Sequence, residues 1–309
     1  MLVVLWGVAS EGTLASVRAA LDRLGAPTQL IDQRDVLDTE VDLDVAEIIR
    51  GEVRIRDQCL DLSAVTACYL RPYDVHCLPA VSDAGPDSPS RRHADAVGES
   101  LSCWSEVTPA LVVNRLQAMA SNSSKPYQLS LIRRFGFDIP QTLVTTCSDE
   151  ALAFWRHYQD VIYKSVSGVR SRVSRLRPEH LDRLNDVSSC PTQFQQYIAG
   201  TDHRVHVVGD EAFACEIRAE ADDYRYAQGD VEIRSTRLPP EIEERCIRLA
   251  KALRLPVAGI DLRRTSDDAW YCFEVNPSPA FSYYQQETGQ PIDRAIAHLL
   301  AAGSRAIGR

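Results

Sequence analysis

Oxygen-bearing side chains interrupt two apolar segments near the end of the chain. Asp261 lies in the predicted strand 257–262, and Glu274 and Asn276 close the apolar segment 270–276. Side chains two positions apart on a strand share one face, so Glu274 and Asn276 are expected to lie together, with Asp261 beside them on the neighbouring strand. Two carboxylates and an amide match the oxygen ligands that Mg²⁺ prefers. The alternative is that both carboxylates end their strands in solvent.

A lysine followed by a basic loop indicates a binding site for phosphate. Lys164 lies near the end of the predicted strand 161–165, and the small-residue segment 166–171 that follows contains Arg170. An ammonium, a guanidinium and the backbone N–H groups of a loop are common ligands of phosphate oxygens. A solvated loop is the alternative, because the segment has a single glycine and Arg170 begins a series of arginines.

The segment 194–198 is an apolar strand that runs to Gly200 and resumes as an alternating strand. A chain of this kind can pass the edge of an adenine ring and offer it backbone hydrogen bonds, although an ordinary hairpin has the same pattern. Arg204 and Arg218 both lie in predicted strands, where each could face a cleft or solvent.

The elements that must position these residues fall into two groups. Over residues 1–115, strands and helices alternate, which predicts a small α/β domain. Its predicted elements are strand 2–6, helix 10–24, strand 28–32, a hairpin of 52–56 with 59–62, strand 65–70, a loop over 81–92 and a helix over 93–107.

The remaining elements mix helices with antiparallel strands, which is typical of the α+β class. Residues 121–124 are expected to cap a helix that begins near Lys125. The other predicted elements are strand 142–145, helix 149–157, strands 161–165, 194–198, 204–208 and 212–218, helix 240–253, strands 257–262 and 270–275, and a helix from Ile292.

Composition narrows the classes of function. The 309 residues suffice for about two domains, and a net charge of -9 argues against a nucleic-acid partner. No apolar run approaches the length of a membrane span, and the start of the chain lacks the features of a signal peptide, so a cytoplasmic protein without a membrane partner is expected. The nine cysteines form no CxxC pair and are expected to be reduced thiols, buried where they lie in apolar strands such as at Cys68.

Taken in their order and spacing, these motifs resemble the ATP-grasp superfamily, in particular the ribosomal-protein glutamate ligases and the microviridin-type (graspetide) peptide ligases. The resemblance covers about residues 113–300. Its motifs are Lys125 with the helix that leads to Pro140-Gln141-Thr142, then Lys164, the segment 194–198, Asp202-x-Arg204, Gly259-x-Asp261 and Glu274-Val275-Asn276-Pro277.

The resemblance implies an α+β / α/β architecture, an ATP-grasp fold preceded by a pre-ATP-grasp α/β domain. The boundaries expected are 1–115 for that first domain, 116–195 for the central subdomain and 196–309 for the C-terminal subdomain. It also implies ATP and Mg²⁺ as cofactors.

Roles for single residues follow from the same resemblance. The phosphates of ATP would be bound by Lys125, Lys164 and Arg170, and the adenine would lie against Gln195, Gln196, Tyr197 and Ile198. Magnesium would be held by Asp261, Glu274 and Asn276. The catalytic arginines near the transferred phosphate would be Arg204 and Arg218, and the substrate would contact Asp223 and Arg225 of an Asp-aromatic-Arg motif.

The chemistry implied is activation of a carboxylate as an acyl phosphate, with release of ADP, followed by attack of a hydroxyl or amine. The first expectation for the substrate is a ribosomal precursor peptide that receives side-chain ester or amide crosslinks. The alternatives are a ligase that adds an amino acid or amine to a small acid or protein tail, and a non-catalytic ATP-binding module. Relatives suggest a homodimer.

Overall fold

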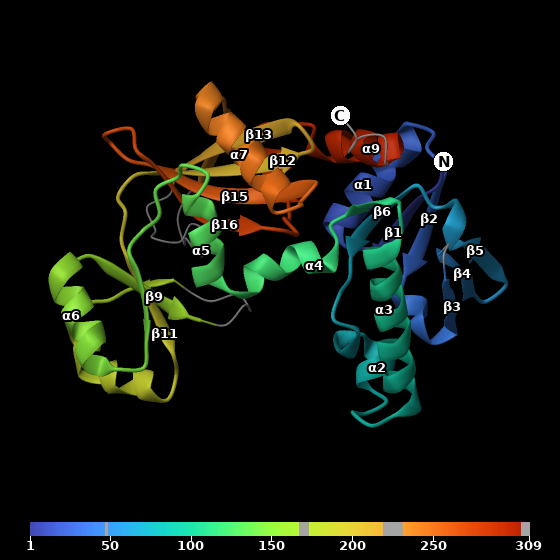
Figure 1. The fold of residues 1–309 in the computed structure, drawn as a ribbon, viewed down its shortest axis with the longest axis horizontal. Helices are drawn as coiled ribbons and strands as arrows, with labels where there is room; N and C mark the ends of the chain where they lie inside the picture. Colours follow the sequence, from blue (N-terminus) through green and yellow to red (C-terminus); the bar gives the residue numbers. More distant parts are fainter. Residues whose placement is uncertain (47–48, 167–172, 219–230, 304–309) are drawn as a thin grey trace.

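The computed structural model describes residues 1–46, 49–166, 173–218 and 231–303. A four-stranded parallel sheet, in the order β2-β1-β6-β7, organises the first part of the chain (Figure 1). Its strands are β1 (Val3–Gly7), β2 (Thr28–Asp32), β6 (Ala67–Arg71) and β7 (Leu111–Val113).

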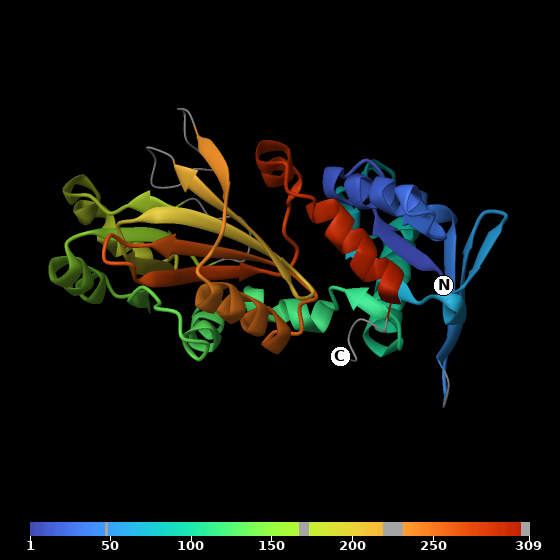
Figure 2. The ribbon, with the colours of Figure 1, turned by 90° about the horizontal axis from the view of Figure 1, so that it is seen from above.

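This first sheet is buried on both faces, which is why its strands are continuous apolar runs. One face packs against α1 (Gly12–Arg23) and, from the far end of the chain, α9 (Ile292–Ala302). Figure 2 shows α9 lying alongside α1. The other face is covered mainly by α2 (Pro79–Ser82) and α3 (Pro89–Val107).

Two expectations for this region need correction. The predicted hairpin is present as β4 (Ile49–Ile55) and β5 (Gln58–Asp61), but a strand that was not predicted, β3 (Thr39–Val45), extends it to a three-stranded meander. The predicted loop over 81–92 is wrong at both ends, because α2 reaches Ser82 and α3 already begins at Pro89. Ser88 caps α3 by accepting a hydrogen bond from the N–H of Arg91 at 3.1 Å, and proline suits the first helical position.

The central part of the chain forms an antiparallel sheet in the order β10-β9-β11-β8. The strands are β8 (Thr142–Thr145), β9 (Val161–Ser165), β10 (Ser174–Arg175) and β11 (Thr192–Gln196). Helix α6 (Ser148–Tyr158) and the 3₁₀ segment η5 (Pro178–Ser188) pack on one face around Phe194. The opposite face carries Lys164.

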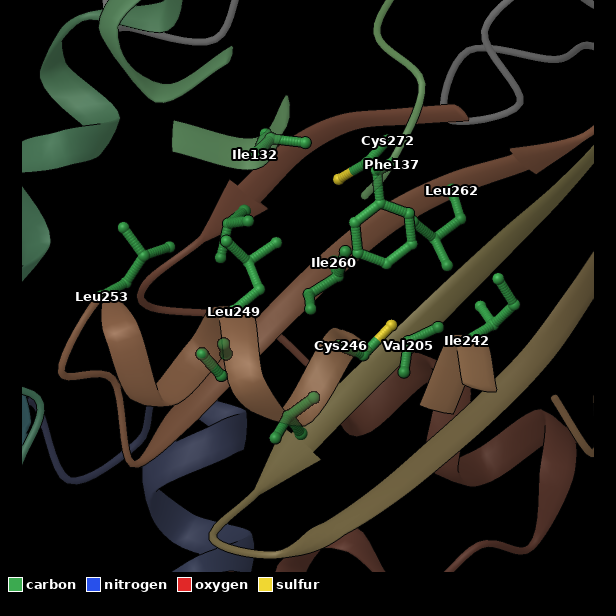
Figure 3. Packing of buried hydrophobic residues seen from close by; sticks show 14 of the residues in the cluster. Ile132, Phe137, Val205, Ile242, Cys246, Leu249, Leu253, Ile260, Leu262 and Cys272 are labelled. Atoms are coloured by element: carbon green, nitrogen blue, oxygen red, sulfur yellow. The ribbon is translucent and has the colours of Figure 1, made fainter. Parts of the chain in front are cut away.

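A five-stranded antiparallel sheet, in the order β14-β13-β12-β15-β16, forms the third unit. Its strands are β12 (Thr201–Val208), β13 (Glu211–Arg218), β14 (Glu232–Thr236), β15 (Val257–Arg264) and β16 (Trp270–Asn276). Helices α5 (Lys125–Arg133) and α7 (Pro240–Ala252) cover one face, and Figure 3 shows their apolar side chains packed against those of the strands. The other face carries a row of polar side chains, beside a small apolar cluster around Ile217 and Tyr284.

Short segments link these units. They are η1 (Gln33–Asp38), η2 (Leu62–Ala64), η3 (Val75–Cys77), α4 (Leu116–Met119), η4 (Ala120–Ser123) and α8 (Ser282–Thr288). The cap expected before Lys125 is not made, because residues 120–123 form η4 and Ser124 makes no side-chain hydrogen bond to α5. No helix in the described ranges is long and apolar enough to span a bilayer. Cys68 is buried as predicted, and the described cysteines are free thiols.

Candidate active site

The register of three neighbouring strands gathers the predicted acidic residues on one face. Asp261 on β15 lies directly opposite Glu274 on β16, and Gly259 lies opposite Asn276. Arg204 on β12 is the direct partner of Asp261 on the other side. Directly paired residues of antiparallel strands project to the same face, so Arg204, Asp261 and Glu274 form a row across the sheet. This is the face that α5 and α7 leave uncovered.

Two cations contact the two carboxylates. The Nζ atom of Lys125 lies 2.9 Å from Oε1 of Glu274, and Nη1 of Arg204 lies 2.6 Å from Oδ1 of Asp261. Lys125 stands at the first position of α5, so the start of that helix delivers its ammonium to the edge of the sheet. The arrangement holds positive charge directly beside the expected metal ligands.

The charges around Glu274 decide its protonation state. Burial alone would raise the pKa of this carboxyl, but the charge and hydrogen bond of Lys125, with the charges of Lys164 and Arg204, hold the pKa below its ordinary value. Glu274 is therefore an anion at neutral pH. Lys164, from the central sheet, is thus near enough for its charge to act on Glu274 together with those of Lys125 and Arg204.

Arg204 needs a glycine beside it. Its side chain is 6% exposed and runs across Gly259, where an added Cβ would lie 2.2 Å from Nη2 of Arg204. Any larger residue at 259 would push the guanidinium away from Asp261. The Gly259-x-Asp261 spacing of the sequence thus has a steric reason in addition to its place in the motif.

The sequence did not reveal the side chains that fix the strands with the expected metal ligands. Gln128 of α5 is buried, and its amide donates to the carbonyl of Val275 at 2.8 Å and accepts from the N–H of Val275 at 2.9 Å. Since β16 is an edge strand, Gln128 pairs with it as another strand would. A glutamine on the face of α5 that also carries Leu129 and Ile132 was the signal that could have identified it.

Asn114 makes a similar clamp from the first domain. It is buried after β7, and its Nδ2 atom donates to the carbonyls of Val257 and Pro277, while its Oδ1 accepts from the N–H of Val257 at 3.2 Å. Asn276 itself accepts a hydrogen bond from the N–H of Ser278 at 2.9 Å through Oδ1. Asn114 and Gln128 therefore hold β15 and β16 at the end of the strand pair where Asn276 lies.

The first domain also reaches the loop that follows Asn276. Arg71, at the carboxyl end of β6, donates from Nη1 to the carbonyl and hydroxyl oxygens of Ser278 at 3.1 and 2.7 Å, and from Nη2 to Glu11 at 2.9 Å. Burial would raise the pKa of Glu11, but the charge of Arg71 and hydrogen bonds from Leu14, Arg71 and Thr13 lower it. The hydrogen bonds from Arg71 to Ser278 join the first sheet to the loop that follows β16, and the ion pair with Glu11 holds the Arg71 guanidinium in place.

The segment expected to bind adenine is fixed to the chain on either side of it in the central sheet. The Gln195 side chain is buried and donates to Oγ1 of Thr142 at 3.0 Å. The N–H of Gln196 donates to Gln141 and that of Tyr197 to Asp160, both at 2.9 Å.

Arg263 ties the end of this segment to the five-stranded sheet. Its guanidinium donates to the carbonyl of Ile198 at 2.7 Å and pairs with both oxygens of Asp202 at 2.6 and 2.9 Å. It also lies 5.5 Å from the ring centroid of Tyr197. The connection between the two sheets is thus anchored where the adenine is expected.

The donor set fits a metal ion that arrives with a nucleotide. Among the described residues, no three His, Cys, Asp or Glu side chains are gathered as a metal site. Asp261 and Glu274 supply two carboxylates, and Mg²⁺ commonly takes one or two and completes its shell with phosphates and water. Buried amide atoms of Gln193 and Gln195 also lack partners within the described ranges, as expected of groups that hydrogen-bond a ligand.

The remaining predicted residues lie elsewhere. Arg218 is exposed and pairs with Glu216 at 2.6 Å, and the β12–β13 register puts it on the face opposite to Arg204. The structure therefore does not bring Arg218 to the acidic row. Arg170, Asp223 and Arg225 lie outside the described residues.

Comparisons with known proteins agree with this geometry. The model of the RimK-like ATP-grasp domain matches residues 120–300. A probable alpha-L-glutamate ligase of Picosynechococcus sp. is 28% identical over 211 residues, which cover 63% of this chain and 68% of that protein. The ribosomal protein bS6–L-glutamate ligase of Escherichia coli is 27% identical over 197 residues, 60% of this chain and 65% of that protein. The aligned part is thus about two thirds of the length of these relatives.

Solved structures match nearly the whole chain. The macrocyclase MdnC of Microcystis aeruginosa MRC, bound with the precursor peptide MdnA, has a TM-score of 0.80 at 23% identity and covers 97% of this chain and 99% of its own. The ATP-grasp ligase PsnB, complexed with a minimal precursor, Mg and ADP, has a TM-score of 0.79 at 26% identity, with 97% and 96% covered. The predicted fold is confirmed, and the chain belongs to the RimK-like ATP-grasp family of ligases.

Proposed function

We propose that this protein uses ATP and Mg²⁺ to join a carboxylate of a ribosomally made precursor peptide to a hydroxyl or amine of the same peptide. The observation that carries the proposal is the meeting of Lys125, Lys164 and Arg204 around Asp261 and Glu274, on the uncovered face of the third sheet. Such a site binds a polyphosphate together with its metal ion.

In the first step, a carboxylate oxygen of the peptide forms a bond to the γ-phosphorus of ATP. The bond from that phosphorus to the β–γ bridging oxygen breaks, and ADP leaves with the electron pair. Lys125, Lys164 and Arg204 neutralise the charge on the phosphoryl oxygens, while Asp261, Glu274 and Asn276 would hold Mg²⁺. When bound, Mg²⁺ supplies Lewis-acid stabilisation of the same oxygens.

In the second step, a hydroxyl or amine attacks the carbonyl carbon of the acyl phosphate. Inorganic phosphate leaves, and the nucleophile loses a proton to solvent. Positioning and charge neutralisation suffice for this chemistry, because the activated carboxyl already carries a good leaving group. The net result is one ester or amide bond and the loss of one water from the peptide.

A peptide substrate is supported by the neighbours that share the whole architecture. PsnB is complexed with a minimal precursor at 26% identity over nearly the full length of both chains. The curated glutamate ligases support a second candidate, addition of an amino acid to a protein tail or small acid, at 27–28% identity over shorter segments. Both candidates share the acyl-phosphate chemistry and differ in the acceptor.

Several expectations remain predictions within this proposal. They are the phosphate role of Arg170, the catalytic role of Arg218, and substrate contacts of Asp223 and Arg225. The division at residues 115 and 195, a homodimer and a cytoplasmic location are likewise predictions.

Mass spectrometry of a reaction with purified protein, ATP, Mg²⁺ and a candidate peptide tests the function. A short reading frame beside this gene, with repeated Ser or Thr and Asp or Glu, is the first peptide to use. Crosslinking lowers the peptide mass by one water per bond, whereas amino-acid addition raises it. If no peptide stimulates ADP release but glutamate together with a protein tail does, the result would favour the second candidate.

A further inference from the structure

Gln193 has a buried side-chain amide whose polar atoms make no hydrogen bond within the described part of the protein. It lies on β11 with 1% of its surface exposed, and neither Nε2 nor Oε1 has a hydrogen-bond partner among the described residues. Buried side-chain amides almost always find partners, because water is no longer available to them. The side chain therefore requires an explanation that apolar packing does not give.

The position of Gln193 in its sheet supplies the explanation. Gln193 lies directly opposite Lys164 on β9, so both side chains project to the same face. Phe194, the next residue, points the other way and joins the core against α6. Directly paired residues of neighbouring strands stand about 5 Å apart, which brings the amide alongside the lysine stem.

Gln195 extends the same face towards the adenine segment. It projects in the same direction as Gln193, and its Oε1 atom likewise lacks a partner within the described ranges, although its Nε2 donates to Thr142. The unpartnered amide atoms of Gln193 and Gln195 thus belong to the face of the central sheet that also carries Lys164. A nucleotide laid along this face would pass all of them.

We propose that Gln193 is a further nucleotide-binding residue, whose Nε2 donates a hydrogen bond to a phosphate oxygen that Lys164 neutralises. The inference rests on the proposed function, since it takes ATP as the occupant of this face. A leucine would fill the same buried position without loss of apolar packing. The glutamine found there instead leaves a buried polar group without a hydrogen bond in the described part of the protein when no nucleotide is bound.

Isothermal titration calorimetry and thermal unfolding of Gln193→Leu test the inference together. Without nucleotide, the melting temperature of the variant should equal or exceed that of the wild type, because an unpartnered buried amide is removed. Affinity for Mg²⁺ with a non-hydrolysable ATP analogue should fall about 10- to 100-fold, the usual effect of losing a hydrogen bond to a charged group. Affinity for adenosine should stay unchanged.

Gln33→Leu is the matched control. Gln33 is equally buried, but its amide donates to the carbonyl of Tyr73 at 3.0 Å and accepts from the Tyr73 N–H at 2.6 Å, within the first domain. Its replacement should lower the melting temperature and leave nucleotide affinity unchanged. Gln193→Met, which keeps the length without the amide, replaces Gln193→Leu if the latter does not fold.

The outcomes separate the two proposals. Wild-type affinity of Gln193→Leu and Gln193→Met for the ATP analogue would overturn the role of Gln193 and leave the proposed function standing. An equal loss of adenosine and ATP-analogue affinity would overturn the phosphate contact. Failure of the wild-type protein to bind any nucleotide would overturn both.

Discussion

Glu274 shows how single charges define the site. It is half-buried, yet it remains an anion because Lys125, Lys164 and Arg204 act on it together. A carboxylate so placed attracts a divalent cation only if phosphate charge arrives as well, since three cations already surround it. Binding of metal and nucleotide should therefore be mutually dependent.

Replacing the expected metal ligands should stop turnover without unfolding the protein. For Glu274→Gln and Asn276→Ala, we expect ADP formation to fall at least about 100-fold, because the first removes a carboxylate charge and the second an oxygen expected to bind the metal. A coupled ADP assay measures the loss, and circular dichroism checks the fold. Glu244→Gln, an exposed acid on α7, is the control and should keep wild-type turnover. Wild-type turnover of Glu274→Gln would refute the metal assignment.

Stability should depend on pH through His206. Burial, and then the charge of Arg204, lower the pKa of His206 well below its ordinary value, and burial also lowers that of His203. The unfolded chain protonates both residues below about pH 6.5, whereas the folded protein resists protonation, so the free energy of unfolding should fall as pH drops. Each histidine contributes at most about 1.4 kcal/mol per pH unit.

Urea denaturation at pH 7.5, 6.0 and 5.0 measures this dependence. The variant His206→Phe keeps a ring against Tyr284. Between pH 6.5 and 5, the part of the fall in its free energy of unfolding that comes from the two histidines should be about half that of the wild type. His157→Gln, at an exposed position, should behave as the wild type. If the free energy of unfolding of His206→Phe fell with pH as steeply as that of the wild type, the role given to His206 would be contradicted.

At the scale of elements, the edge strand β16 is held by a side chain instead of a neighbouring strand. Gln128→Leu should lower the free energy of unfolding by about 2–4 kcal/mol, because the buried N–H and carbonyl of Val275 both lose their partner. Chemical denaturation measures the change. Gln117→Leu, on the exposed side of α4, should change it by less than about 0.5 kcal/mol. Equal stability of the two variants would show that Gln128 does not hold β16.

Some elements could be predicted to the residue, and others could not. Strands β8 and β9 have the predicted bounds because turn residues enclose them. β3 was missed although Glu40 to Val45 alternates acidic and apolar residues, because its acidic side chains resemble those of a loop. The side chains of Asp261, Glu274 and Asn276 share a face as predicted from their spacing, while the pairing of Asp261 with Arg204 depends on long-range register.

The placement of Arg218 was within reach of sequence reasoning. Gly209 and Asp210 form a two-residue turn between β12 and β13, which fixes the pairing of the strands. Counting from that turn puts Arg204 and Arg218 on opposite faces. Gln128 and Asn114 were not within reach, because each acts on backbone atoms more than 100 positions away in the chain.

At the scale of the whole molecule, the Arg71 contact joins the first domain to the acidic strands. Arg71→Ala should lower substrate-stimulated ADP formation by about 10-fold or more, because the loop at Ser278 loses its anchor beside Asn276. Nucleotide affinity by calorimetry should change less than about twofold, since the hydrogen bonds of Arg71 go to Ser278, Pro279 and Glu11 and to none of the residues expected to bind ATP. Arg34→Ala, whose partner Asp32 lies within the first domain, is the control. Wild-type turnover of Arg71→Ala would show that the contact does not serve the reaction.

The position of the C-terminal helix affects how the protein folds during its synthesis on the ribosome. Ile292, Ile296 and Leu300 complete the core around Val3 and Leu5, although β7 ends at Val113 and α9 begins only at Ile292. At about 5–20 residues per second, roughly 10 to 40 s of translation separate the two. During that time one apolar face of the nascent first sheet is partly bare, so this domain closes last although its strands are made first.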